Sequence, residues 1–232
     1  MPSNIETNLA DIRSRIASAA KPSGRDASEI KLVAVSKTHP PALLREALAA
    51  GARFFGENKV QEAEVKILDL GRNAAEWHLI GHLQSNKARK AVQLFDVIHS
   101  LDSFELAERL ERICIEEDRD RLSVFIHVDL AGEETKSGIA EEKLPKLVEI
   151  LSRCVRVRLD GLMTLPPYFE NANDVRPFFR RLRETRDKLK AAGAFQNGKG
   201  ELSMGMSHDF EIAIEEGATV IRVGTAIFGG RS

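Results

Sequence analysis

The segment KLVAVSKTHP, residues 31–40, ends an apolar stretch with a lysine whose amine is a candidate nucleophile. Its small and β-branched residues predict a short buried strand, and Pro40 and Pro41 stop that strand soon after Lys37. A lysine in this position is either a solvated strand end or an amine held at the mouth of a site. The second alternative requires other residues that complete such a site.

Two segments near the other end of the chain combine glycines with hydroxyl residues, as anion-binding loops do. SMGMSHD precedes a predicted helix at about residues 208–216, and RVGTAIFGG follows a predicted strand. Glycines let the backbone approach an anion, while amides and hydroxyls donate to it. The segments favour a monophosphate site, although each alone also suits a helix cap or plain turns. Asp209 would repel a phosphate unless its carboxylate turns away.

Lys37 and a phosphate site together suit a phosphorylated carbonyl compound bound as a Schiff base, which needs a partly deprotonated amine. Arg222 is the first residue of the second glycine segment and brings a permanent positive charge near the same space. Its alternative role is an ion pair in the protein core.

Strand-like and helix-like segments alternate along the chain. These elements must position the candidate residues. Eight strands are predicted, at residues 31–36, 52–55, 77–80, 95–98, 123–129, 156–162, 201–204 and 219–223. Helical patterns between them imply parallel strands with right-handed crossovers. We expect one α/β domain over residues 1–232, a (β/α)8 TIM-type barrel, with an open doubly wound sheet as the alternative.

An amphipathic helix at about residues 4–20 precedes the first strand, whereas only nine residues follow the eighth. Because nine residues are too few for a full outer helix, we expect the N-terminal helix to cover the seam where the eighth strand meets the first. Lys37 and the glycine segments then share the face of the barrel at which the strands end, where barrels of this type place their chemistry.

Composition limits the partners of the protein. The 34 basic and 35 acidic residues give a net charge of -1, so we expect no binding to nucleic acid or membranes through bulk charge. Cys114 and Cys154 have neither disulfide-framework nor metal-site spacing. The first twenty residues lack the apolar core of a signal peptide, and no later run is long enough to span a membrane, so we expect a cytoplasmic protein.

Six segments identify a family. LVAVSKTHP, FGENKVQE, WHLIGHLQSNK, GLMTL, LSMGMSHDFEIAIEEGAT and IRVGTAIFG closely resemble, in this order and spacing, the pyridoxal phosphate homeostasis proteins. The resemblance covers residues 31 to about 230 and implies a barrel like the N-terminal domain of alanine racemase, with pyridoxal 5′-phosphate (PLP) linked as a Schiff base to Lys37. It implies that Arg222 faces the pyridine nitrogen. It also places Ser203, Met204, Ser207, Gly224 and Thr225 around the phosphate, and Asn58, His82 and Met163 beside the cofactor.

An arginine at the pyridine nitrogen donates a hydrogen bond but gives up no proton, so the ring remains a weak electron sink. We therefore expect a monomeric carrier or buffer in PLP homeostasis, without substantial catalysis, that makes transient contacts with PLP-accepting apoenzymes. The alternatives are a PLP-dependent racemase-type enzyme and a class I aldolase in which Lys37 attacks a sugar phosphate. Tyr168, the only tyrosine, does not match a racemase acid.

Several other residues have a structural role as an alternative to a functional one. Lys136, in a loop after the fifth strand, is a candidate for receiving or relaying the cofactor, and a plain surface loop is the alternative. The segment RPFFRRLRETRDKLK predicts a solvated helix face. His78 is expected to pack inside the barrel, and His208 either flanks the phosphate or lies on the surface.

Overall fold

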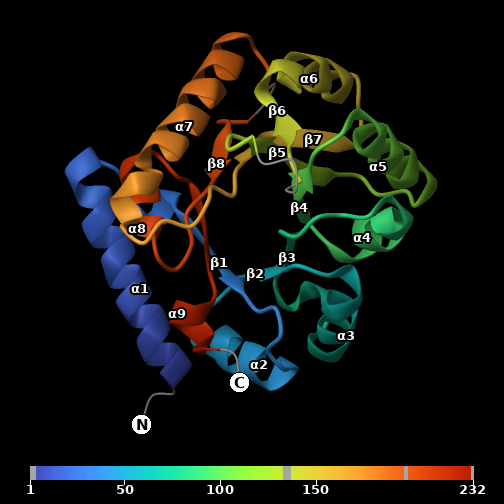
Figure 1. Ribbon diagram of the computed structural model, residues 1–232. Helices are drawn as coiled ribbons and strands as arrows, with labels where there is room; N and C mark the ends of the chain where they lie inside the picture. The colour runs from blue at the N-terminus through green and yellow to red at the C-terminus, as the bar shows by residue number, and fades with distance from the viewer. Residues whose placement is uncertain (1–3, 133–136, 196–197, 231–232) are drawn as a thin grey trace.

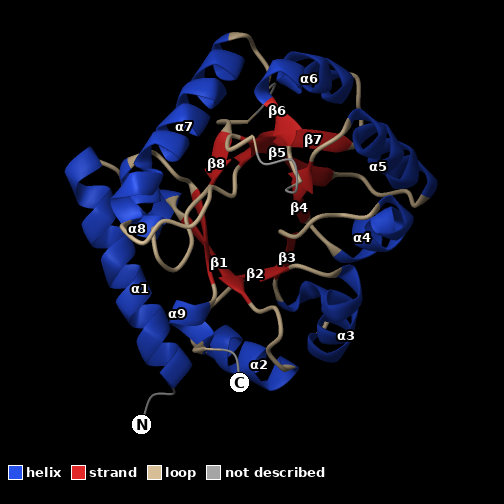
Figure 2. Ribbon diagram, in the orientation of Figure 1, coloured by secondary structure: helices blue, strands red, loops and turns tan. Residues whose placement is uncertain are grey.

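Eight parallel strands close into a barrel, and helices surround it on the outside (Figures 1 and 2). The structure is a computed structural model that describes residues 4–132, 137–195 and 198–230. The strands are β1 (Lys31–Val35), β2 (Phe54–Glu57), β3 (Glu76–Leu79), β4 (Val97–Leu101), β5 (Leu122–Asp129), β6 (Ile139–Ala140), β7 (Val157–Met163), β8 (Glu201–Ser203) and β9 (Val220–Val223). The α-helices are α1 (Asn4–Ala20), α2 (Pro41–Ala49), α3 (Val60–Leu70), α4 (Ala88–Leu94), α5 (Phe104–Glu116), α6 (Leu144–Ser152), α7 (Arg176–Ala191), α8 (Phe210–Glu215) and α9 (Thr225–Phe228).

Strand pairing follows chain order from β1 to β5, continues through β7, β8 and β9, and returns to β1. The pairing of β4 with β5 closes the sheet, so the barrel prediction is confirmed and the open doubly wound alternative is wrong. The two-residue β6, which was not predicted, pairs with the end of β5 outside the ring of eight.

The N-terminal helix lies where β9 meets β1, as predicted. Its residues Ile5, Leu9, Ile12 and Ile16 recur every three or four positions and are buried. The helix packs against α2, α8 and α9, the helices on either side of the seam (Figure 1). Asn8 Nδ2 donates to the Ile227 carbonyl at 2.8 Å, so the helix is tied to the last turn of the fold.

Two predicted strands begin too early. The segment predicted from residue 52 begins at Phe54, because the Ala52 amide still donates to Ala47 and completes the end of α2. The segment predicted at residues 95–98 runs from Val97 to Leu101, because Phe95 is the C-cap of α4. As a result, His99 lies inside β4 and not at its end.

Side chains alternate between the lumen of the barrel and the layer under the helices. Val33, Val97, Phe125, Met163 and Val220 come from five strands and form a small apolar cluster of their own. A larger apolar core fills the space between the barrel and the helices. Because the lumen cluster is small, the remaining inward positions are free to carry polar residues.

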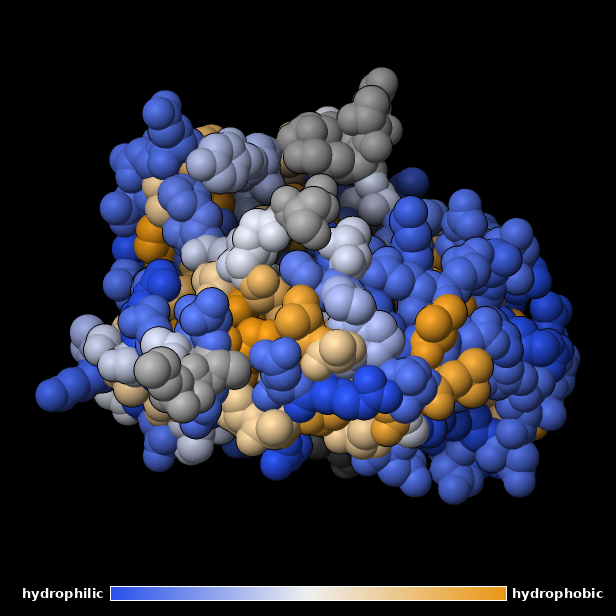
Figure 3. Space-filling view, turned by 90° about the horizontal axis from the view of Figure 1, so that it is seen from below, coloured by the Kyte–Doolittle hydropathy of each residue, from blue (hydrophilic) through white to orange (hydrophobic). Residues whose placement is uncertain are grey.

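Hydrophilic side chains dominate the face shown in Figure 3, with hydrophobic side chains gathered near its centre. In the part of the chain that the structure describes, no helix is both long and apolar enough to cross a bilayer.

Close approach of β7 and β8 at Gly161 predicts sensitivity to a single methyl group. A Cβ atom at Gly161 would lie 2.1 Å from the Glu201 carbonyl oxygen. We expect Gly161→Ala to lower the free energy of unfolding by about 1–3 kcal/mol in urea titrations, because the strands must separate. Gly198→Ala, whose Cβ would meet no atom of the described residues closer than 3.9 Å, is the control and should have little effect. Equal losses would contradict the steric explanation.

Candidate functional site

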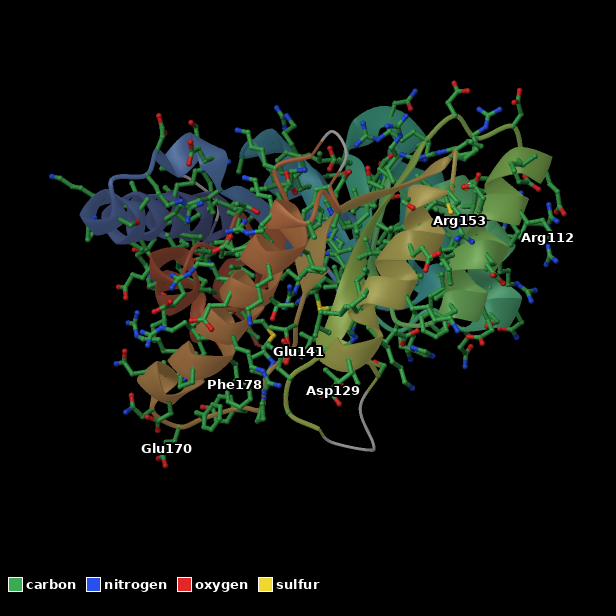
Figure 4. All side chains as sticks on the ribbon, turned by 90° about the horizontal axis from the view of Figure 1, so that it is seen from above. Arg112, Asp129, Glu141, Arg153, Glu170 and Phe178 are labelled. Atoms are coloured by element: carbon green, nitrogen blue, oxygen red, sulfur yellow. The ribbon has the colours of Figure 1, made fainter. Side chains whose placement is uncertain are left out.

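A cavity of about 450 Å³ opens where the barrel strands end. In Figure 4, Asp129 at the end of β5 and Glu170 in the loop after β7 lie toward this edge of the molecule, and Arg153, after α6, lies toward the opposite edge. Of the predicted site residues, the structure brings seven together around the cavity. They are Lys37, Asn58, His82, Ser207, Arg222, Gly224 and Thr225.

Lys37 lies two residues beyond the end of β1, between neighbours held by polar contacts that are buried at Ser36 and exposed at Thr38. The Ser36 hydroxyl donates to Glu57 Oε1 at 2.6 Å, and Lys66 Nζ donates to the Ser36 carbonyl at 2.7 Å. On its other side, Thr38 has φ of 69°, which is unusual for a β-branched residue. These contacts fix the backbone on both sides of Lys37.

The buried contacts form one ionic cluster beneath the lysine. Lys66 Nζ lies 2.7 Å from both Glu57 Oε1 and Glu62 Oε1, and Glu62 also accepts from the Thr38 amide at 2.5 Å. Burial raises the pKa of the Glu57 carboxyl, while Lys66 opposes that shift. The cluster therefore holds the turn that presents Lys37, at the cost of burying charge.

Arg222 is buried within β9 and lines the cavity. Its Nη1 donates to Ser203 Oγ at 2.6 Å, and its Nη2 donates to the Thr164 carbonyl at 2.9 Å. Within the described ranges no carboxylate forms an ion pair with it, so the core ion-pair alternative is wrong for these residues. Burial lowers the pKa of Arg222 to about 10, which Asp209 partly offsets, so the guanidinium stays charged at neutral pH.

The loops after β8 and β9 meet at the cavity. The Gly224 amide donates to Ser207 Oγ at 3.3 Å, which joins the two predicted anion-binding segments. Gly205 has φ of 91°, and a Cβ atom there would lie 2.6 Å from Ala213 Cβ in α8. Ser207 is not the N-cap of α8, so the helix-cap alternative for this hydroxyl is wrong.

The Asp209 carboxylate folds back onto the backbone of the loop after β8 and does not face the cavity. Its Oδ1 accepts from the Met206 amide at 2.6 Å, and its side chain is absent from the described wall of the cavity. Burial raises the pKa of Asp209, while the Met206 amide and Arg222 oppose the shift. The expected repulsion of an anion is therefore reduced by orientation.

Two cavity residues, Ser100 in β4 and His127 in β5, were not predicted as site residues. Ser100 Oγ and His127 Nδ1 are buried and have no hydrogen-bond partner among the residues the structure describes. Burial, and to a smaller extent Arg222, lowers the pKa of His127 to about 4. The alternation of side chains along a strand could have predicted His127, because residues 125, 127 and 129 point to the same face of β5. Unpaired polar atoms of this kind indicate a ligand that supplies their partners.

Asn58 and His82 line the cavity from the loops after β2 and β3. His82 Nδ1 lies 3.1 Å from Asp102 Oδ2, and the His82 side chain is 53% exposed. Burial raises the pKa of Asp102, while His82 opposes the shift. Gly81 permits the two loops to touch, because a Cβ there would lie 2.3 Å from the Asn58 carbonyl oxygen.

Three predicted site residues do not reach the described wall of the cavity. Met163 belongs to the lumen cluster, Met204 packs in the outer core, and Ser203 is buried beneath Arg222. Lys136 lies outside the described residues. His208 lines the cavity, is exposed and has its ring 5.2 Å from that of Tyr168.

The segment RPFFRRLRETRDKLK is only partly a solvated helix face, because three of its arginines form ion pairs with Glu216 beyond α8. They are Arg176, Arg180 and Arg183. His78 packs inside the barrel, as predicted, and is 1% exposed.

Comparisons with known proteins agree with this geometry. The family model described as "Alanine racemase, N-terminal domain" matches residues 4–232, so the chain is a barrel of that family. Alanine racemase from Corynebacterium glutamicum, at 20% identity and a TM-score of 0.67 over 97% of this chain and 60% of that one, shares the fold.

Closer relatives define the group within that family. A protein of Aquifex aeolicus is 44% identical over 96% of each chain, and one of Escherichia coli is 40% identical over 98% of this chain and 97% of that protein; both are named pyridoxal phosphate homeostasis protein. The structure of PipY from Synechococcus elongatus with PLP bound is 41% identical, with a TM-score of 0.83 over 97% of this chain and all of that one. The chain belongs to the family of pyridoxal phosphate homeostasis proteins.

The ionic cluster beneath Lys37 predicts a large cost for removing its cation. We expect Lys66→Met to lower the free energy of unfolding by about 3–5 kcal/mol, because Glu57 would keep a buried charge without its partner. Lys90→Met, which removes a partly exposed pair with Glu64, should cost less than about 1 kcal/mol in the same urea titrations. Similar losses in the two variants would show that the cluster is not effectively buried.

The buried imidazole of His127 predicts a pH dependence of stability. Between its ordinary pKa of 6.5 and about 4, the unfolded chain binds a proton that the folded chain does not. The free energy of unfolding should therefore fall as pH is lowered through this range, by at most about 3 kcal/mol from this group. His127→Gln should flatten that fall in pH-dependent unfolding, whereas His208→Gln at the exposed rim should leave it intact. An unchanged slope in His127→Gln would refute the assignment.

Proposed function

We propose that this chain binds PLP in the cavity, linked as a Schiff base to Lys37, and acts in PLP homeostasis as a carrier or buffer of the cofactor. One observation carries the proposal: a single cavity joins the strand-end lysine, a buried arginine and two glycine-hydroxyl loops. The names of relatives at 40–44% identity and the PLP bound in PipY support it.

The cavity residues match the chemical groups of the cofactor one by one. Lys37 supplies an amine for the aldehyde, and Arg222 supplies a donor for the pyridine nitrogen. Ser207, Gly224 and Thr225 supply hydroxyl and backbone donors for the phosphate. In this arrangement Asn58 and His82 flank the cofactor. We further propose that Ser203, Met204 and Met163 act from behind the cavity wall, Ser203 through Arg222 and the two methionines through packing.

We infer that catalysis is weak or absent. The pyridine ring of PLP supplies an electron sink when bound, but its strength depends on protonation of the nitrogen. Arg222 donates without releasing a proton, and no carboxylate of the described chain pairs with it. Tyr168 is 78% exposed and does not line the described cavity. The racemase-type alternative is favoured by one observation, the contact of His82 with Asp102, which suits a proton-transfer group.

We further propose that the protein works as one domain, as a monomer, in a reducing cytoplasm. Cys114 and Cys154 are free thiols, and burial raises their pKa values to about 11 and about 12, so neither is readily oxidised. Transient contacts with PLP-accepting apoenzymes would then occur at the face where the cavity opens.

Borohydride reduction of the purified protein with PLP tests the linkage. We expect peptide mass mapping to find the reduced cofactor on Lys37, and Lys37→Ala to weaken binding on the order of 100-fold because the covalent bond is lost. Lys59→Ala, which removes an exposed lysine from the loop after β2, is the matched control and should bind as the wild type does. Modification of another lysine in place of Lys37 would overturn the assignment.

Solvent exchange of the α-proton of added amino acids, followed by NMR, separates carrier from enzyme. We expect no exchange above the Lys37→Ala background. Exchange at a catalytic rate that His82→Asn abolishes would support the racemase-type alternative instead.

A further inference from the structure

A chain of buried polar side chains crosses the lumen from the cavity toward the opposite end of the barrel. It begins where Arg222 Nη1 meets Ser203 Oγ at 2.6 Å. Ser203 Oγ lies 2.8 Å from His99 Nδ1, and His99 Nε2 lies 2.8 Å from His78 Nδ1. All four residues are buried, at 3% exposure or less. The proposed site uses Arg222 and, through it, Ser203, but neither imidazole.

The chain ends at the floor of the barrel, where the strands begin. His78 Nε2 lies 3.0 Å from Oε1 of Glu76, the first residue of β3, a close electrostatic contact without the alignment of a hydrogen bond. Lys31, the first residue of β1, places its Nζ 3.1 Å from the same oxygen. Glu76 is partly exposed, and His78 lowers the pKa of its carboxyl to about 2, so a charged carboxylate closes the chain.

Arg222 determines the direction of the first hydrogen bond in this chain, and the others follow from where the Ser203 hydrogen goes. A guanidinium only donates, so Ser203 Oγ must accept from it. Besides Arg222, the Ser203 hydroxyl contacts only His99 in the described structure. Its hydrogen therefore goes to His99 Nδ1. His99 is then neutral and donates from Nε2 to His78 Nδ1, which leaves the hydrogen of His78 on Nε2, against Glu76.

The opposite arrangement of the two imidazoles is possible geometrically but leaves groups without partners. If both carried their hydrogen on Nδ1, Ser203 would accept from two donors and its own hydrogen would point at none. His78 Nε2 would then turn a lone pair toward the Glu76 carboxylate. The carboxylate at the floor therefore selects the direction in which Ser203 donates, and a donating hydroxyl is a stronger acceptor for Arg222.

The packing and charges around the imidazoles fit a fixed neutral pair. Phe125 stacks on His99 with ring centroids 4.4 Å apart, and Phe54 meets His78 edge-on at 6.0 Å. Burial lowers the pKa of both imidazoles. The charged groups that face them are Glu76, Lys31, Asp96 and Arg222, of which only the two acids favour protonation of His78.

We propose that Ser203, His99 and His78 are positioning residues for Arg222, and that Glu76, at the far end of the barrel, fixes their donor direction and so tunes cofactor affinity. The effect on affinity rests on the proposed function, because it requires PLP to present its pyridine nitrogen to Arg222. The donor direction itself does not require PLP. The two parts are therefore tested separately.

The first test is ¹⁵N NMR of the histidine rings in the unloaded protein. We expect His78 and His99 to be neutral and protonated on Nε2 at pH 8. In Glu76→Leu the fixed direction should be lost and the Nδ1-protonated form should appear, whereas Glu201→Leu, on the same floor but outside the chain, should leave both rings unchanged. A charged ring or an Nδ1-protonated ring in the wild type would overturn the assignment.

The second test is PLP affinity, with the absorption maximum of the bound cofactor as a further readout. We expect Glu76→Leu to weaken binding by about tenfold and to shift the maximum, and Glu201→Leu to do neither. Ser203→Ala, at the Arg222 end of the chain, should also weaken PLP binding. This variant replaces Glu76→Leu in the test if Glu76→Leu does not fold. Unchanged affinity and spectrum in both variants would overturn the positioning role. Failure of the wild type to bind PLP would instead refute the proposed function, with the NMR result unaffected.

Discussion

The site depends on one buried guanidinium that has no described carboxylate beside it. Arg222 is held by a hydroxyl and a carbonyl, both neutral, so its positive charge remains available to the cavity. A carboxylate partner would neutralise that charge and bring proton exchange to the same place. The barrel tolerates the arrangement because Ser203 and the imidazoles behind it satisfy the guanidinium without removing its charge. In the proposed function, cofactor recognition and weak chemistry thus have the same physical origin.

The backbone around Lys37 is held by a different set of interactions. A strand that ends in the barrel mouth would leave its next residues free to move, yet Ser36 and Thr38 are both held by the cluster of Glu57, Lys66 and Glu62. Burying these charges is costly, and Thr38 adopts a conformation that its branched side chain disfavours. This turn therefore lowers the stability of the fold, and it gives Lys37 a fixed backbone on either side.

Much of this arrangement could be predicted from local patterns, and the remainder could not. Apolar runs between helical periodicities located all eight barrel strands, because each strand is buried on both faces. Residues at the strand ends, such as Lys37 and Gly224, followed from the barrel rule. His127 was missed because a polar residue within an apolar strand looks like a packed core residue. The pairing of Glu57 with Lys66 and the orientation of Asp209 depend on tertiary contacts between elements, which periodicity does not encode.

The seam of the barrel has a consequence for synthesis of the protein. Helix α1, the first element, is tied to the carbonyl of Ile227 across 219 residues of sequence. The cavity likewise takes Lys37 from the first strand and Thr225 from beyond the last. A nascent chain therefore cannot close the barrel or complete the cavity until the segment from Thr225 to Ile227 has emerged from the ribosome. Under the proposed function, cofactor capture therefore follows translation, because a partly made chain lacks the part of the cavity that comes from beyond the last strand.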